Sequence, residues 1–162
     1  MSMWRIGEGW DIHELVVGRP LILGGLLIEH THGLKGHSDA DALLHAITDA
    51  LLGAAGLGDI GRHFPDTDPT YRGADSGVLL QRAMARVRDR GWGLVNLDAT
   101  IIAQAPKLAP HLSAMGLRIS QLLEVAPEAI NVKAKTAEHL GPVGQLQAIE
   151  ARAVCLLSRQ ST

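Results

Sequence analysis

The sequence predicts an α+β fold, a two-layer sandwich in which helices pack on one face of a mixed β-sheet, as a single domain over residues 1–162. Three observations predict it. The 162 residues, 46% hydrophobic and 20% charged, have the length and composition of one globular domain. Strand-like and helix-like segments are interspersed, although the first two are both strand-like. No internal repeat or linker divides the chain.

Strand-like segments fill the first part of the chain. Residues 4–13 alternate and predict a strand. Residues 21–28 predict a second strand, which bends or bulges at its Gly-Gly pair. Residues 33–37 are punctuated by glycine and are expected to form a loop.

Two long helices are predicted next. Leucine and isoleucine recur at helical spacing over about 39–55, with Ser38 or Asp39 as the expected N-cap. Residues 56–68 are rich in Gly, Asp and Pro and predict a loop. The second helix is predicted over 76–90, where a following glycine ends it in a left-handed cap.

The second half of the chain alternates between the two kinds of element. Strands are predicted over 94–104, 130–136 and 148–157. A third helix is predicted over 110–125, because a proline begins it, and a short helical turn over 137–140.

Composition and missing motifs exclude several classes of function. Lys plus Arg is 15 and Asp plus Glu is 17, so the net charge is −2 and no basic block supports nucleic-acid binding. Aromatic residues are 3%, too few for a base-stacking platform. The motifs of Walker-type NTPases and Rossmann dinucleotide enzymes are absent. Cys155, the single cysteine, is expected to be a buried core residue.

The hydropathy pattern gives no candidate membrane span. The longest uncharged apolar run near the start, residues 20–28, is far shorter than the roughly 20 residues that a spanning helix needs. The N-terminus has no signal-peptide layout. We therefore expect a soluble, cytoplasmic protein that has neither a nucleic acid nor a membrane as its partner.

Asp11 and His13 are the first candidate metal ligands. Residues i and i+2 of a strand point to one face, so this carboxylate and imidazole project together. His45 lies in the middle of the first predicted helix. If the three side chains converge, they form a three-ligand site with an open fourth position, the pattern of a catalytic zinc. By itself, an Asp-x-His pattern on a strand more often belongs to an ordinary exposed sheet surface than to a metal site.

Other polar residues surround these candidates. Asp41 and Asp49 lie four residues to either side of His45, so either could accept its second ring N–H, although a solvated stripe of ion pairs explains the pattern equally well. Residues 36–39 precede the helix and offer N–H groups to a phosphate, whereas simple N-capping also accounts for them.

Basic and acidic residues also lie at the ends of predicted strands. Lys107 follows one strand, and Lys133 and Lys135 share a face of the next. Glu138, just beyond, could hold a harder cation such as Mg²⁺ between phosphates. Residues 64–69 predict an acidic turn by their Pro and Asp content.

Read together, these segments resemble the 2-C-methyl-D-erythritol 2,4-cyclodiphosphate synthase family of the non-mevalonate isoprenoid pathway. The matching segments run in family order over nearly the whole chain: 9–13, 36–41, 44–51, 58–61, 64–69, 73–76, 100–107 and 131–136. The resemblance implies conversion of 4-diphosphocytidyl-2-C-methyl-D-erythritol 2-phosphate to the 2,4-cyclodiphosphate. The 2-phosphate attacks the β-phosphorus and CMP leaves.

The resemblance also implies cofactors and an assembly. Asp11, His13 and His45 would bind Zn²⁺, and Glu138 would contact an Mg²⁺ or Mn²⁺ that bridges the α- and β-phosphates. The family is a homotrimer whose active sites lie between subunits, so a second copy of the chain is an expected partner.

Substrate contacts are implied in the same way. Asp59, Gly61 and residues 64–68 would hold the methylerythritol part, and residues 103–108 with 134–136 the cytidine diphosphate part. The full implied set of substrate-binding residues is Asp11, His13, His37, Ser38, Asp59, Ile60, Gly61, Phe64, Pro65, Asp66, Thr67, Asp68, Ala103, Gln104, Ala105, Pro106, Lys107, Leu108, Ala109, Ala134, Lys135, Thr136, Ala137 and Glu138.

The residue chemistry fits such a reaction. The attacking and leaving groups are both phosphates, so the protein must place two anions in line and offset their repulsion rather than supply a covalent nucleophile. His37 and Thr136 are implied as catalytic residues, lying where charge develops in the transition state.

One stretch departs from the family pattern. Pro142, Gln145 and Gln147 stand where the family often has an aromatic residue, an arginine and an acid. That stretch lines a cavity on the family's trimer axis that can hold an isoprenoid diphosphate. Without the arginine, a diphosphate lacks its bidentate partner, so weak or no binding is expected there.

Two other functions are alternatives to the cyclase. A metallophosphoesterase would use the Asp/His site to activate water and would release inorganic phosphate. A non-catalytic, metal-stabilised oligomer would show metal-dependent stability without turnover, but it would not need Lys107, Thr136 and Glu138.

Overall fold

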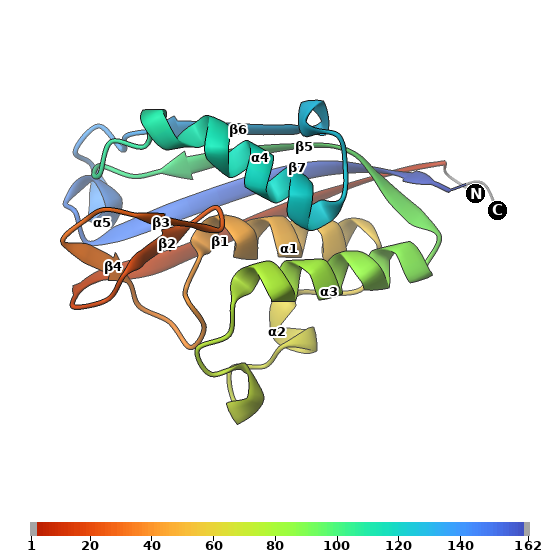
Figure 1. Cartoon of the computed structure of the whole chain (residues 1–162), viewed down its shortest axis with the longest axis horizontal. Coiled ribbons are helices and arrows are strands. Elements are labelled where there is room, and N and C mark those ends of the chain that lie inside the picture. Colours follow the sequence, from red (N-terminus) through yellow and green to blue (C-terminus); the bar gives the residue numbers. More distant parts are fainter. Residues whose placement is uncertain (1–2, 161–162) are drawn as a thin grey trace.

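A mixed five-stranded sheet forms the centre of the computed structural model, which describes residues 3–160 (Figure 1). The strand order is β4-β1-β7-β5-β6, in which only β5 and β6 run parallel. The strands are β1 (Trp4–Val17), β4 (His32–Leu34), β5 (Trp92–Ile102), β6 (Ile130–Lys135) and β7 (Ala148–Arg159). The predicted mixed sheet is confirmed.

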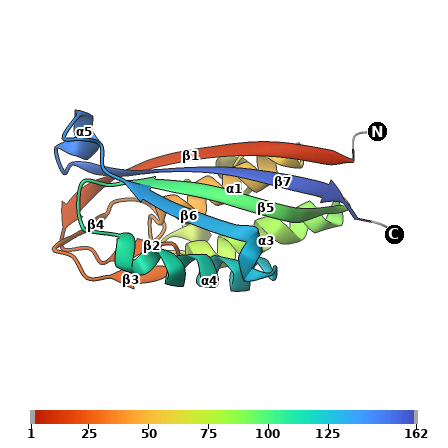
Figure 2. The ribbon, with the colours of Figure 1, turned by 90° about the horizontal axis from the view of Figure 1, so that it is seen from above.

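The long helices lie together on one face of this sheet, as Figure 2 shows. They are α1 (Ala42–Ala54), α3 (Ser76–Asp89) and α4 (Leu112–Leu123). Helix α1 packs against β1 and β7, α4 against β6, and α3 against α1. The two-layer α+β prediction is therefore confirmed, and α3 ends close to its predicted glycine, Gly91, at φ +76°.

Short elements complete the chain and correct several predicted bounds. They are α2 (Ile60–His63), α5 (Gly141–Gly144) and the 3₁₀ turns Pro69–Tyr71, Ala109–His111 and Pro127–Ala129. The helix after β6 is α5, so the helical turn predicted over 137–140 was placed too early. No helix within residues 3–160 is long and apolar enough to cross a bilayer.

The predicted strand over 21–28 is wrong. The chain instead forms a separate hairpin of β2 (Leu21–Leu23) and β3 (Leu26–Ile28). Gly24 and Gly25 have φ of +62° and +73°, and they reverse the chain in a two-residue turn. Residues other than glycine rarely adopt such positive φ values. The loop predicted next contains the short strand β4, which pairs with the end of β1.

Glycine lets β1 lie directly on α1. A Cβ at Gly9 would be 1.8 Å from the carbonyl oxygen of Ala46, and one at Gly7 would be 2.0 Å from that of Ala50. Real side chains do not tolerate such distances, so glycine is required at both positions. Because strand residues alternate, Asp11 projects toward α1 from the same face as these glycines.

Asp41 joins the start of α1 to the hairpin. Its buried carboxylate accepts N–H bonds from Leu44 at 3.0 Å, Gly24 at 3.0 Å and Gly25 at 2.7 Å. Asp41 is thus the N-cap, not Ser38 or Asp39, because the helix begins later than the hydrophobic period indicates. Burial raises the pKa of Asp41 to about 6, since desolvation outweighs these donors.

Replacing Gly9 with alanine is expected to lower the free energy of unfolding by about 3 kcal/mol or more, because the new Cβ separates β1 from α1. Gly116→Ala is the control. Gly116 lies inside α4 with open space around its Cβ position, so alanine there should stabilise by up to about 1 kcal/mol. Urea unfolding of both variants measures the effect, and equal midpoints would contradict this account of the contact.

Asp41→Ala is expected to lower the free energy of unfolding by about 2–4 kcal/mol, because buried N–H groups lose their acceptor. Asp75 offers a matched comparison, since it caps α3 through Gly77 but is exposed. Asp75→Ala should lower the free energy of unfolding by only about 1 kcal/mol. Equal losses in thermal unfolding would show that the contacts of Asp41 to the hairpin contribute nothing beyond an ordinary cap.

Candidate metal centre

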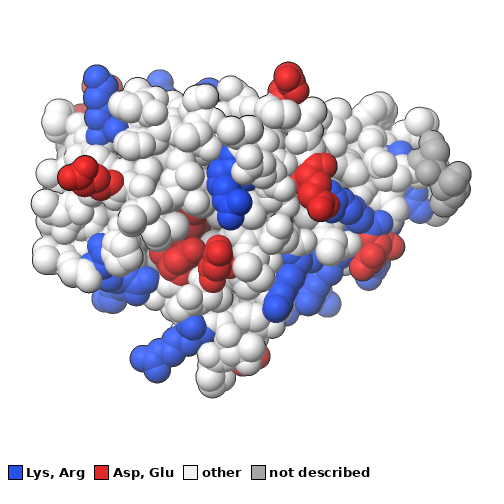
Figure 3. Space-filling view, in the orientation of Figure 1, with Lys and Arg blue, Asp and Glu red and all other residues white. Residues whose placement is uncertain are grey.

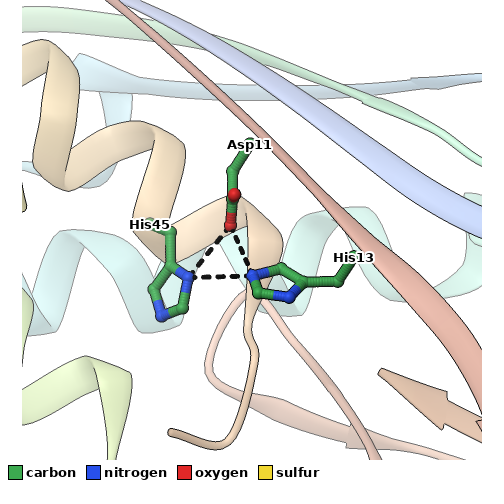
Figure 4. Close-up of side chains that lie close together, drawn as sticks. All are labelled: Asp11, His13 and His45. Carbon is green, nitrogen blue, oxygen red and sulfur yellow. Dashed lines mark hydrogen bonds and ion pairs between the residues drawn. The ribbon is translucent and has the colours of Figure 1, made fainter. Parts of the chain in front are cut away.

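Two adjacent elements bring Asp11, His13 and His45 together, as Figure 4 shows. The first two side chains project from β1 and the third from α1. The Oδ2 atom of Asp11 lies 2.7 Å from His13 Nε2 and 2.9 Å from His45 Nδ1, and those two nitrogens are 3.3 Å apart. The side chains are 12–25% exposed, so a small ion can reach them without being surrounded by water.

The hydrogen bonds of His13 leave a lone pair pointing into this group. Its Nδ1 lies 2.8 Å from the carbonyl oxygen of Lys35, and a carbonyl only accepts, so Nδ1 carries the proton. In the neutral ring Nε2 then faces Asp11 and His45 as an acceptor. Acceptor atoms this close repel one another unless a proton or a metal cation lies among them. The donor set, one carboxylate oxygen and two imidazole nitrogens, suits a divalent transition metal.

The ionisation of the group agrees with this geometry. Burial opposes the charged form of Asp11, but hydrogen bonds and charge from His13 and His45 outweigh it and lower the pKa of Asp11 to about 2. Burial likewise opposes protonation of His13, yet the bond to Asp11 raises the pKa of His13 above its ordinary value. The site therefore attracts positive charge, and a metal must compete there with a proton.

The second nitrogen of His45 has hydroxyl partners. Its Nε2 lies 2.9 Å from Ser76 Oγ and 3.2 Å from Ser38 Oγ. The prediction that Asp41 or Asp49 orients this ring is wrong. Asp41 is used at the helix cap, and Asp49 accepts the N–H of Ile60 at 2.7 Å.

A chain of hydrogen bonds sets the proton on that ring. The carboxylate of Asp39 accepts from the hydroxyl of Ser76 in a short contact and from the N–H of Ser76. With its one hydrogen donated to Asp39, Ser76 Oγ accepts from Nε2–H of His45. The Nδ1 atom of His45 is then free for a metal. Sequence reasoning missed Ser76, because nothing in its local pattern links it to a histidine on another helix.

A cavity of about 430 Å³ opens beside the metal centre. Its wall consists of His13, Gly36, His37, Ser38, His45, Ile60, Gly61, Phe64, Pro65, Asp66, Tyr71 and Leu79. Tyr71 and Leu79 are additions that the sequence did not indicate. The ring centres of Phe64 and Tyr71 are 5.5 Å apart in an edge-on contact, and the guanidinium of Arg86 lies 5.3 Å from the Phe64 ring centre, so two side chains hold this ring.

Three of the predicted substrate residues from the same region lie outside this wall. Asp59 caps α2 through the N–H of Arg62 at 2.9 Å, and Asp68 accepts from the N–H of Thr70 at 2.9 Å. Thr67, between them, does not line the cavity either. The two aspartates therefore shape the loop that carries the cavity wall.

The predicted cytidine diphosphate residues lie elsewhere in the chain. Residues 103–109 follow β5, and residues 134–138 comprise the end of β6 and the residues after it. β7 separates those strands from β1 (Figure 1). None of them lines the cavity beside the metal centre. Glu138 accepts a bond from Thr136 Oγ1 at 3.1 Å, and Gln104 accepts from the N–H of His139 at 3.2 Å. Within one chain the two groups of predicted site residues are thus not brought together.

Comparison with known proteins places these features in a family. The YgbB family model matches residues 4–158. The 2-C-methyl-D-erythritol 2,4-cyclodiphosphate synthase of Bordetella avium is 62% identical over 158 residues, which cover 98% of both chains. The structure of the bifunctional IspDF from Campylobacter jejuni is 44% identical to this chain, with a TM-score of 0.93. The match covers 96% of this chain but only 42% of the longer IspDF chain. A CDP-bound structure of such a synthase is 47% identical, with a TM-score of 0.88, and covers 95% of this chain and 100% of its own.

Ser76→Ala is expected to weaken the binding of a divalent transition metal, tested with Zn²⁺ as the probe, by about 10- to 100-fold, because His45 loses the acceptor that orients it. Competition of the metal-stripped protein with a chromophoric chelator measures the affinity. Ser38→Ala is the matched control, and a smaller loss is expected because Ser38 lies farther from Nε2. Unchanged affinity in Ser76→Ala, or an equal loss in both variants, would contradict the relay from Asp39.

Proposed function

The chain belongs to the 2-C-methyl-D-erythritol 2,4-cyclodiphosphate synthase family, and from this premise we propose which of its residues carry the reaction. It is a lyase of isoprenoid biosynthesis by the non-mevalonate pathway. It converts 4-diphosphocytidyl-2-C-methyl-D-erythritol 2-phosphate to 2-C-methyl-D-erythritol 2,4-cyclodiphosphate and releases CMP. The convergence of one carboxylate and two imidazoles carries the proposal for the residues, because a reaction between two phosphates needs concentrated positive charge.

We propose that Asp11, His13 and His45 hold Zn²⁺, and that Glu138 contacts Mg²⁺ or Mn²⁺. One carboxylate oxygen and two imidazole nitrogens, as in Asp11, His13 and His45, suit Zn²⁺. The exposed carboxylate of Glu138 suits a harder cation such as Mg²⁺. Bound divalent ions would supply positive charge to phosphate oxygens. At 4 Å and an effective dielectric constant of 20, one pair of unit charges contributes about 4 kcal/mol, so one such contact offsets a phosphate–phosphate repulsion of similar size.

The catalytic residues in this proposal are His37 and Thr136. His37 lies in the wall of the cavity beside the metal centre, and its Nε2 is 3.3 Å from the carbonyl oxygen of Asp68, so the ring can hold a proton near the cavity. Thr136 offers a hydroxyl next to Glu138. Both would orient phosphate oxygens rather than form a bond to phosphorus.

The substrate is proposed to span two regions. Its methylerythritol part would occupy the 430 Å³ cavity, against Phe64 and the backbone at Ile60 and Gly61. Its cytidine diphosphate part would lie on residues 103–109 and 134–138. A relative with bound CDP supports a nucleotide site in the family.

Active sites between the subunits of a homotrimer would reconcile these regions. The two groups of residues are separated within one chain, and in a trimer a second copy would supply the missing half. The sheet face opposite the helices supports assembly, because it exposes large apolar side chains. Ile6 is 74% and Trp10 is 48% exposed. Extended apolar surface of this kind typically marks an interface. The cytoplasmic location and the single domain remain predictions.

Phosphorus NMR of the protein with its substrate, Zn²⁺ and Mg²⁺ tests the activity. CMP and a cyclic diphosphate are expected, whereas inorganic phosphate would indicate the phosphoesterase, and unchanged substrate the non-catalytic oligomer. His45→Ala is expected to lose metal and turnover while keeping the circular dichroism of the wild type. Turnover and bound zinc retained in this variant would contradict the assigned metal centre.

A mixing experiment tests the shared active site. His45→Ala and Glu138→Gln are each expected to be inactive, since each removes a proposed metal contact. Co-expressed in one cell, they should form mixed trimers with some sites intact, so part of the wild-type turnover returns. Mixed trimers purified with two different affinity tags that stay inactive would show that each chain builds its whole site alone.

A further inference from the structure

A second cavity, of about 540 Å³, shares part of its wall with the cavity beside the metal centre but has a different lining. Its wall consists of Arg19, Gly36, His37, Ser38, Arg72 and Gly73. The segment 36–38 also lines the first cavity, so it forms a wall between the two. The second cavity has two arginines in its wall but no carboxylate and no apolar side chain.

Hydrogen bonds hold one of these arginines in place. Arg19 donates from Nη1 to the carbonyl of Gly36 at 3.1 Å and from Nη2 to that of Ser38 at 2.9 Å. A guanidinium has five N–H donors, so the remaining ones are available to a ligand. Within residues 3–160, neither Arg19 nor Arg72 has a carboxylate within ion-pair distance. Two positive charges therefore line the cavity without a carboxylate paired to either of them.

The backbone of the shared wall adds further donors. The carbonyls of Gly36 and Ser38 are bound by Arg19, and that of His37 accepts the N–H of Gly73 at 2.8 Å. By contrast, no acceptor among the described residues binds the N–H groups of Gly36, His37 and Ser38. These three residues lie in the cavity wall, so their N–H groups can donate to an anion bound there.

The nearest aspartates in sequence have other hydrogen-bond partners and do not line this cavity. Asp39 accepts from Ser76, Asp68 from the N–H of Thr70 and Asp75 from that of Gly77, and none of these aspartates lines the second cavity. On the face shown in Figure 3, basic side chains lie at the edge near the segment that leads into α3.

We propose that the cavity between Arg19 and Arg72 binds a phosphate group, free or carried on a small monoester, at a site separate from the metal centre. Arginine forks match the oxygens of phosphate, and the backbone N–H groups add further bonds. The inference does not depend on the proposed function, since it needs no metal and no turnover. An anion here would contact His37 and Ser38, which also line the cavity beside the metal centre.

Calorimetric titration of the metal-stripped protein with inorganic phosphate, at constant ionic strength, tests the proposal. Saturable binding to one site per chain is expected in the wild type. Arg72→Gln should weaken it by about 10- to 100-fold, the effect of losing one or two charged hydrogen bonds. Arg82→Gln is the matched control, because Arg82 is an exposed arginine of α3 outside both cavities and its loss changes the net charge equally.

Two further comparisons locate the bound anion. His45→Ala keeps both arginines and should bind phosphate like the wild type. Glycerol 2-phosphate, titrated in the same way, should bind at the same site. Tighter binding of the ester assigns the natural ligand to the monoesters, and weaker binding assigns it to free phosphate. No saturation in the wild type, equal weakening by Arg72→Gln and Arg82→Gln, or loss of binding in His45→Ala alone would each overturn the proposal.

Discussion

Contact between the backbones of β1 and α1 determines where the metal ligands lie. Gly7 and Gly9 remove the side chains that would hold the strand away from the helix. Asp11 follows on the same face of the strand, and Ala46, which Gly9 meets, is the neighbour of His45 in the helix. A pair of glycines thus determines a distance between side chains from two different elements. The three ligand atoms meet because the strand cannot lie farther out or slide without losing this fit.

The loop before α1 depends on buried or half-buried carboxylates. Asp41 ties the helix to the β2–β3 hairpin, while Asp39 ties the loop to Ser76 at the start of α3. These acids lie next to residues that are placed to bind a ligand. Their role is to hold His37 and Ser38 in a segment that has no regular structure of its own. The backbone N–H groups of Gly24, Gly25, Leu44 and Ser76 are thereby satisfied, which fastens the loop to the hairpin and to α3.

Period and alternation were enough to predict a mixed sheet with helices packed on one of its faces. They were also enough to place Asp11 and His13 on one face. The hairpin was missed because Gly24 and Gly25 fit a bulge as well as a turn until the left-handed φ of both is known. The partner of His45 was missed for a different reason. Neighbours in a helix suggested Asp41 and Asp49, whereas the structure uses Ser76 from another helix. A contact between distant segments leaves no mark in the local pattern. The same limit applies to Tyr71 and Leu79, and to the distance between the metal centre and residues 103–109.

The strand order has a consequence for how the chain is made. β7 lies between β1 and β5, yet it is the last of the described elements to leave the ribosome. Until then β1 has only the short β4 beside it, and β5 has only β6. The two halves of the sheet therefore wait with unpaired edges, and the final strand closes both at once. Such late, long-range pairing makes folding slow and leaves the nascent chain prone to pairing with its neighbours, so assistance by chaperones should matter more for this fold than its size suggests.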